Sequence, residues 1–137
     1  MSIMGSLIIP QTLFYEMISH CREVYPSEAC GILAGKDGRV HKVYRMTNAE
    51  NSAVSYLMDS REQLAVMKEL SNQGLDITAF YHSHPYADAL PSPKDIDLAF
   101  YDDPFYVIVS LAHKDPLIRA FEIKNGIVKE VEILTDS

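Results

Sequence analysis

The sequence has few cysteines and no long hydrophobic run. Its two cysteines, Cys21 and Cys30, cannot form a disulfide framework, and neither belongs to the C-x-x-C pair that structural zinc sites use. No stretch approaches the roughly 18 apolar residues that a membrane span requires, and no Lys or Arg precedes the short apolar run in the first ten residues. We therefore expect a protein of the cytoplasm, a reducing compartment, without a membrane partner.

Basic residues are also scarce. Twelve Lys and Arg stand against nineteen Asp and Glu, and the resulting net charge of -7 repels phosphate backbones. The sequence thus predicts no nucleic-acid partner, and it indicates no particular oligomeric state. The 137 residues, 47% of them hydrophobic, match the usual size of one domain and can form a core. We expect a single domain over residues 1–137.

Hydrophobic periodicity predicts three helices and about six strands. Asp59 and Glu62 resemble a capping box at the start of one helix, which Gly74 would end. The predicted helices cover residues 10–25, 60–73 and 93–100, and the predicted strands cover 30–34, 40–44, 77–84, 105–111, 117–123 and 127–133. This mixed order implies an α/β or α+β fold in which helices are layered on a sheet.

Two histidines stand at the end of the predicted strand over 77–84. Side chains two apart on a strand point to the same face, so His82 and His84 present both imidazoles to one spot. Ten residues separate His84 from Asp95, which falls on the first turn of the next predicted helix and could return a carboxylate to that spot. Two nitrogens and one oxygen would hold zinc and leave a fourth position for water.

Each of these residues also has an ordinary interpretation. A His-x-His pair at a strand end can be two solvent-facing histidines, and Ser92 with Asp95 forms a Ser-x-x-Asp arrangement that caps a helix without any metal. Glu28, which follows Pro26 at the start of a predicted hairpin, can be a solvated carboxylate. Cys30 lies in an apolar strand, where we expect a buried and inert thiol.

Taken together, these residues resemble the signature of the JAMM (MPN+) family of zinc metalloproteases. The segment His82-Ser83-His84-Pro85, followed by Ser92 and Asp95, is similar to the metal-binding part of that signature. The segment 26–35, Pro-Ser-Glu-Ala-Cys-Gly-Ile-Leu-Ala-Gly, resembles the part that carries the family's glutamate. The resemblance covers a core of about residues 7–133 and implies a cytidine-deaminase-like JAMM/MPN sandwich, a mixed sheet layered with helices.

The resemblance also implies a role for each residue of the motif. His82, His84 and Asp95 match the zinc ligands, Glu28 matches the general acid/base, and Ser92 matches the residue that helps to stabilise the oxyanion. Zinc lowers the pKa of a bound water to about 7, and Glu28 would take its proton and deliver it to the departing amine. The implied enzyme is a zinc metallopeptidase that hydrolyses an amide bond.

The length of the chain favours one branch of this family. Its small prokaryotic members, of the Mec type, cleave after the terminal Gly-Gly of ubiquitin-like sulfur carriers, and this chain resembles them because it leaves little room for the insertions of polyubiquitin-specific relatives. We expect such a carrier as its substrate. The segment 48–58 would supply a sheet edge for the diglycine tail. Tyr81 and Tyr86 flank the two histidines, where they would either shape the substrate groove or pack at the strand end.

Three alternatives belong to other classes of protein, and one of them, a DNA-repair-associated relative with a similar His-x-His-Pro motif, is disfavoured by the acidic net charge. A noncatalytic MPN scaffold that binds protein partners is the main one, but such modules usually lack one or more of the metal ligands. A zinc base deaminase would carry H-x-E and P-C-x-x-C patterns, and this sequence has neither.

Overall fold

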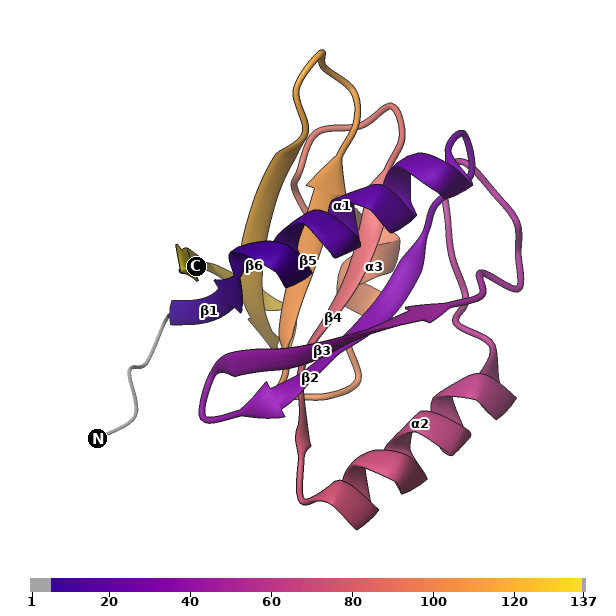
Figure 1. The fold of residues 1–137 in the computed structure, drawn as a ribbon. Coiled ribbons are helices and arrows are strands. Elements are labelled where there is room, and N and C mark those ends of the chain that lie inside the picture. The colour runs from indigo at the N-terminus through magenta and orange to yellow at the C-terminus, as the bar shows by residue number, and fades with distance from the viewer. Residues whose placement is uncertain (1–5, 137) are drawn as a thin grey trace.

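A curved mixed sheet of seven strands forms the centre of the computed structural model, which describes residues 6–136 (Figure 1). The strands are β1 (Ser6–Pro10), β2 (Cys30–Lys36), β3 (Arg39–Met46), β4 (Asp76–His84), β5 (Phe105–Ser110), β6 (Leu117–Lys124) and β7 (Ile127–Asp136). The helices are α1 (Gln11–Val24), α2 (Ser60–Gln73) and α3 (Pro93–Asp97). This α+β arrangement confirms the predicted sheet layered with helices.

The sheet closes on itself, which the sequence does not predict. The strand order is β1-β3-β2-β4-β5-β6-β7, and β1 completes the ring by pairing in parallel with both β7 and β3. The contact with β3 is narrow, because a single residue pair, Ile8 with Arg39, carries it. The sequence gives no sign of β1 as a strand, since its five residues run directly into α1 at Pro10.

Most predicted elements are present, but the helix predicted over 93–100 ends early. Helix α3 stops at Asp97 after little more than one turn. The main chain of Tyr101 then binds the hydroxyl of Tyr106, which accepts from its N–H at 3.1 Å and donates to its carbonyl at 2.9 Å. These two bonds direct the chain into β5 in place of a longer helix.

The capping box predicted for α2 is only half formed. The carboxylate of Asp59 accepts hydrogen bonds from the N–H groups of Arg61 and Glu62 at 3.0 and 3.1 Å, and Gly74 ends the helix in the left-handed region at φ 69°. The Glu62 side chain does not return to Asp59. It accepts from the main-chain N–H and the hydroxyl of Thr47, each at 2.7 Å, and so ties α2 to the end of β3.

Each face of the sheet carries its own apolar cluster. One face packs against α1, which contributes Met17 and Cys21. The opposite face holds Cys30, Ile32 and Phe80 in a second cluster. Because side chains alternate along β4 from Ala79 onwards, these residues are divided between the two clusters, and the even-numbered ones face away from α1.

Tyr81 belongs to the α1 side of β4. Its ring is fully buried, and its hydroxyl lies 2.6 Å from Nδ1 of His20. A Cβ atom on Gly31 would lie 2.1 Å from that ring, so only glycine leaves room for it at this position of β2. Tyr81 therefore points away from the face that carries His82, and of the two roles considered for it the structure confirms packing and excludes a substrate groove on that face.

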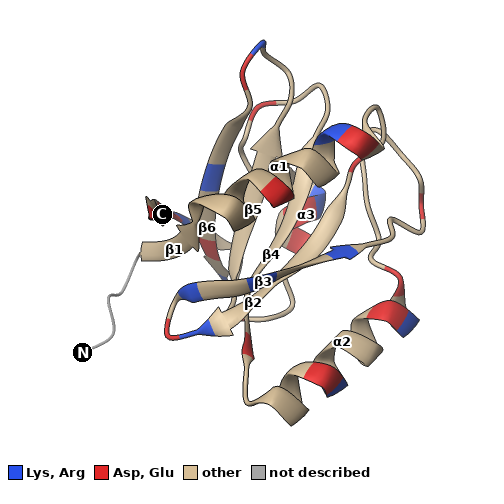
Figure 2. Cartoon of the chain, viewed as in Figure 1, with Lys and Arg blue, Asp and Glu red and all other residues tan. Residues whose placement is uncertain are grey.

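Basic and acidic residues alternate along the two long helices but not along β3. Figure 2 shows both signs interspersed along α1 and α2, whereas the charged residues of β3 are all basic. Within residues 6–136, no helix has the length and apolar character that crossing a membrane would demand.

Candidate metal centre

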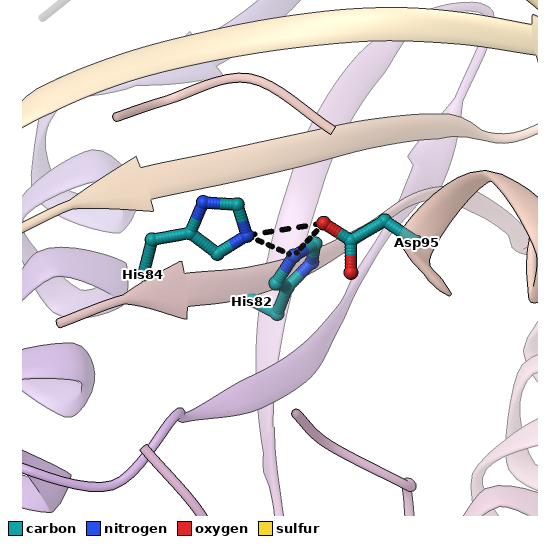
Figure 3. A group of neighbouring side chains, drawn as sticks. All are labelled: His82, His84 and Asp95. Carbon is teal, nitrogen blue, oxygen red and sulfur yellow. Dashed lines mark hydrogen bonds and ion pairs between the residues drawn. The ribbon is translucent and has the colours of Figure 1, made fainter. Parts of the chain in front are cut away.

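Two histidines project from the end of β4 towards α3 (Figure 3). His82 and His84 are both buried, with exposed fractions of 3% and 4%, and their Nε2 atoms lie 3.1 Å apart. They share a face because strand side chains alternate, and the strand ends directly after them, where Pro85 follows. The predicted pairing of these imidazoles is therefore present in the fold.

Asp95, on α3, brings a carboxylate to the same point. Its Oδ2 atom lies 3.1 Å from Nε2 of His82 and 3.0 Å from Nε2 of His84 (Figure 3). Ligand atoms on a tetrahedral zinc ion, with bonds of about 2.0–2.1 Å, lie roughly 3.3 Å apart. These three atoms could hold such an ion with very small shifts, so the donor set fits a divalent metal.

The orientation of His84 suits a metal ligand. Its Nδ1 lies 2.7 Å from the main-chain carbonyl of Asp88, and because a carbonyl can only accept, Nδ1 carries the hydrogen. In the neutral ring, Nε2 then keeps its lone pair, which is aimed at the point shared with His82 and Asp95. When one ring nitrogen of a histidine binds a metal, a hydrogen bond from the other nitrogen to a carbonyl fixes both the tautomer and the position of the ring.

Burial and mutual hydrogen bonding set the ionisation of these three groups. Burial lowers the pKa of His82. Burial also opposes the charged form of His84, but hydrogen bonds with Asp95 and the Asp88 carbonyl raise its pKa. Burial opposes the charge of Asp95 as well, yet hydrogen bonds from the Nε2–H groups of His82 and His84, which His84 carries only in its protonated form, hold its pKa well below the usual range. Asp95 is therefore an ionised carboxylate at neutral pH, as a metal ligand must be.

Asp95 and Ser92 also form a capping box. The Ser92 hydroxyl accepts from the N–H of Asp95 at 3.0 Å, and Oδ2 of Asp95 accepts from the N–H of Ser92 at 2.9 Å. The same Oδ2 faces both histidines, so capping and metal binding do not exclude each other. No acceptor within residues 6–136 takes the O–H proton of Ser92, which remains able to donate to a ligand.

Glu28 lies opposite His84, just before β2. The β2–β4 ladder pairs Cys30 with His82. The pairing continues one residue beyond β2, because the N–H of Ser83 donates to the carbonyl of Ala29 at 3.0 Å. Two residues on, the same register sets Glu28 across from His84, on the same face of the sheet. Glu28 is 4% exposed, and its Oε1 has no hydrogen-bond partner within the described part of the chain. A buried carboxylate oxygen without a partner is costly and is typical of a functional group.

The surroundings of Glu28 bring the pKa of its carboxyl group close to neutral pH. Burial raises the pKa of Glu28 to about 7, while the charge of His84 lowers it and that of Asp95 raises it. A carboxyl group with such a pKa can both take and release a proton under ordinary conditions. Glu28 thus has the ionisation of a general acid/base.

Tyr56 is a site residue that the sequence does not reveal. Its ring stacks on that of His82, with centroids 4.5 Å apart at 26°. It belongs to the loop over residues 48–58, which Asn48 ties to Glu28 by donating to its carbonyl at 3.1 Å. This loop contains only an isolated bridge, between Asn48 and Met58, so the predicted edge is not a strand. Twenty-five residues separate Tyr56 from His82, and no spacing rule links them.

Two other sequence candidates lie apart from the cluster or are inert. Burial raises the pKa of the Cys30 thiol to about 12, which confirms the predicted unreactive thiol. Tyr86 is 62% exposed and packs edge-on against Tyr25, with ring centroids 5.6 Å apart. The structure records no contact between Tyr86 and the three clustered residues.

Comparison with known protein families gives one match over most of the chain. The family described as "Prokaryotic homologs of the JAB domain" matches residues 10–124. The curated relatives include a "CysO-cysteine peptidase" of Mycobacterium tuberculosis, 40% identical over 129 residues, which cover 90% of this chain and 87% of that protein. They also include a "Probable TtuB-protein conjugate cleaving protease" of Thermus thermophilus, 36% identical over 121 residues, which cover 88% of this chain and 78% of that protein.

Solved structures show the same fold. The solution structure of a protein from Desulfitobacterium hafniense superposes with a TM-score of 0.86 at 37% sequence identity, covering 96% of this chain and 93% of that one. The similarity therefore extends over nearly the whole length of both molecules.

Proposed function

Because this chain belongs to the prokaryotic JAB (JAMM/MPN) family, we propose that it is a zinc-dependent peptidase that hydrolyses the amide bond after the C-terminal Gly-Gly of a ubiquitin-like sulfur carrier. The observation that carries the proposal is the convergence of His82, His84 and Asp95 on one point beside the buried Glu28. A noncatalytic MPN scaffold does not need such a complete set.

The three clustered side chains would hold zinc through Nε2 of His82, Nε2 of His84 and Oδ2 of Asp95. When bound, zinc supplies Lewis acidity, which makes water acidic enough to react near neutral pH and polarises the carbonyl of the substrate. The hydrogen bond between His84 and the Asp88 carbonyl keeps that ring in the ligating tautomer.

Glu28 would move the proton during hydrolysis. Its partnerless Oε1 can accept a proton from the attacking water, and a pKa of about 7 allows it to hold that proton and pass it to the departing amine. Ser92 would donate its free O–H to the oxyanion that develops on the carbonyl oxygen. Both groups thus act on the substrate, and neither is needed to bind the metal.

The names of two relatives support the substrate class. One is a peptidase for CysO-cysteine and the other cleaves TtuB-protein conjugates, and both cover most of this chain. For the tail itself, we propose the main chain of Tyr56 as the contact, since no described residue hydrogen-bonds its N–H or carbonyl. Glycines can approach such a backbone closely without side-chain clash.

The remaining features of the proposal concern extent and location. We propose that residues 1–137 form one JAB domain, because β1 near the start pairs with β7 near the end of the chain. The cytoplasmic location stays a prediction, and it is compatible with the two free, buried cysteines.

Cleavage of an extended carrier tests the proposed function. The zinc-loaded protein is incubated with a ubiquitin-like sulfur carrier that has extra residues after its Gly-Gly end, and the masses of the products are measured by mass spectrometry. We expect a product that ends at the second glycine, its loss on chelation and its return on addition of zinc. An intact carrier that nevertheless binds the zinc-loaded protein would favour the scaffold alternative.

A further inference from the structure

A lysine stands directly beside the clustered aspartate. Lys94 precedes Asp95 on the first turn of α3, and its Nζ lies 3.1 Å from Oε1 of Glu50. Both side chains are part-exposed, at 48% and 36%, and Glu50 also accepts from the Ser55 hydroxyl at 2.6 Å. This ion pair therefore joins the helix of Asp95 to the loop that binds Glu28.

The charges around Glu28 explain why a cation matters here. Asp95 and Glu50 are both carboxylates and both raise the pKa of Glu28, whereas Lys94 lowers it. Apart from His84, Lys94 is the one basic side chain among the main charges that act on the Glu28 carboxyl. A substrate that brought a further carboxylate to this place would meet mainly negative groups, unless Lys94 bound it.

The chemistry of the leaving group decides whether such a carboxylate exists. When a single amino acid is joined to the carrier, a free carboxylate lies one carbon from the amide nitrogen. In a longer peptide or a conjugate to a lysine side chain, that position is a neutral amide or a methylene. The two relatives differ in this respect by name, since one acts on a cysteine adduct and the other on protein conjugates.

On the basis of the proposed function, we propose that Lys94 binds the α-carboxylate of a single amino acid released from the carrier, and that it makes the enzyme prefer a one-residue leaving group. Glu50 occupies Lys94 when no substrate is present. A part-exposed ion pair of this kind adds little to stability, so a substrate carboxylate can replace Glu50 at small cost. Lys94 is thus a specificity-determining residue that acts on the departing half of the substrate.

Two matched substrates isolate this contact. A ubiquitin-like sulfur carrier is extended after Gly-Gly by one alanine, either as the free acid or as the C-terminal amide. We expect kcat/KM for the free acid to exceed that for the amide about tenfold, the effect of one charge-assisted hydrogen bond. Lys94→Met should abolish this preference and Lys94→Arg should retain part of it, whereas Lys129→Met, which changes an exposed lysine of β7, should leave it intact.

A binding measurement gives a second readout that needs no turnover. In a Glu28→Gln background, the free-acid carrier should bind about tenfold more tightly than the amide in calorimetry, and adding Lys94→Met should equalise the two Kd values. Glu50→Gln should keep or increase the preference, because it frees Lys94. Equal kinetics and equal Kd values for both substrates in the parent protein would overturn the role of Lys94, whereas cleavage of neither substrate would count against the proposed function itself.

Discussion

The hydroxyl of Ser83 accepts a hydrogen bond from the main-chain N–H of Ala29 at 2.8 Å. Ser83 is fully buried on the α1 side of β4, and its own N–H donates to the Ala29 carbonyl at 3.0 Å. This double contact fixes the residue next to Glu28 against the strand that carries His82 and His84. The distance between Glu28, the proposed general acid/base, and the proposed ligands therefore depends on a serine that faces away from them.

Replacing this serine should affect both stability and rate. Ser83→Ala leaves a buried N–H without a partner, which costs about 1–3 kcal/mol in the free energy of unfolding, measured by urea titration. Because Glu28 loses its anchor, kcat should also fall while the zinc content stays the same. Ser71→Ala, in an exposed turn of α2, is the matched control and should change neither quantity. A Ser83→Ala protein with unaltered stability would contradict the anchoring role.

The two roles of Ser92 can be separated by substitution. Ser92→Gly removes the hydroxyl but keeps an acceptable N-cap, so it should cost only a few tenths of a kcal/mol in stability. Its kcat should nevertheless fall about 10²- to 10³-fold, as expected when one donor to an oxyanion is lost. Ser92→Ala should show the same loss of rate and a further loss of stability of about 1 kcal/mol. Full activity in the glycine variant would reduce Ser92 to a helix cap.

The buried carboxyl of Glu28 should make the zinc-free protein less stable as the pH rises. Its pKa is raised from 4.5 to about 7, so the folded state holds this proton more tightly than the unfolded state does. The stabilising contribution is complete below about pH 4.5 and is lost as the pH rises towards about 7. Glu28→Gln should therefore be more stable than the parent protein at pH 8, by about 3 kcal/mol at most, and equally stable near pH 4.5.

Urea unfolding at the two pH values, with a chelator present, measures this difference. Glu132→Gln, at an exposed position of β7, serves as the control and should follow the parent protein at both. If the free energy of unfolding of Glu28→Gln changed with pH as that of the parent protein does, burial of the charged Glu28 would carry no energetic cost.

Local patterns in the sequence were sufficient to predict the positions of the three proposed metal ligands. The alternation rule places His82 and His84 on one face, and the Ser92 cap explains where α3 begins and hence where Asp95 lies. The sequence left capping and metal binding as competing roles for Asp95. The structure shows that one oxygen atom of Asp95 contacts the Ser92 N–H and both imidazoles. The spacing of residues along the sequence does not predict that a single atom makes all three contacts.

Contacts between segments far apart in the sequence account for what could not be predicted. The position of Glu28 across from His84 follows from the pairing of β2 with β4, which are separated by β3 and α2. Closure of the sheet depends on the parallel pairing of β1 with β7, at opposite ends of the chain. The stacking of Tyr56 on His82 comes from a loop without a regular pattern. The role proposed for Glu28 came from the family resemblance, and the pairing of β2 with β4 explains only its position near His84.

The most direct test of the account measures zinc content and turnover together in three variants. The parent protein should hold about one zinc ion per chain, as a single three-ligand site implies. Glu28→Gln should keep that ion and lose turnover about 10²- to 10⁴-fold, as expected when a general acid/base is removed. Asp95→Ala should lose both the ion and turnover, while Asp97→Ala, an exposed residue of the same helix, should lose neither. Full turnover by Asp95→Ala that contains no metal would contradict the central claim that these side chains hold a catalytic zinc ion.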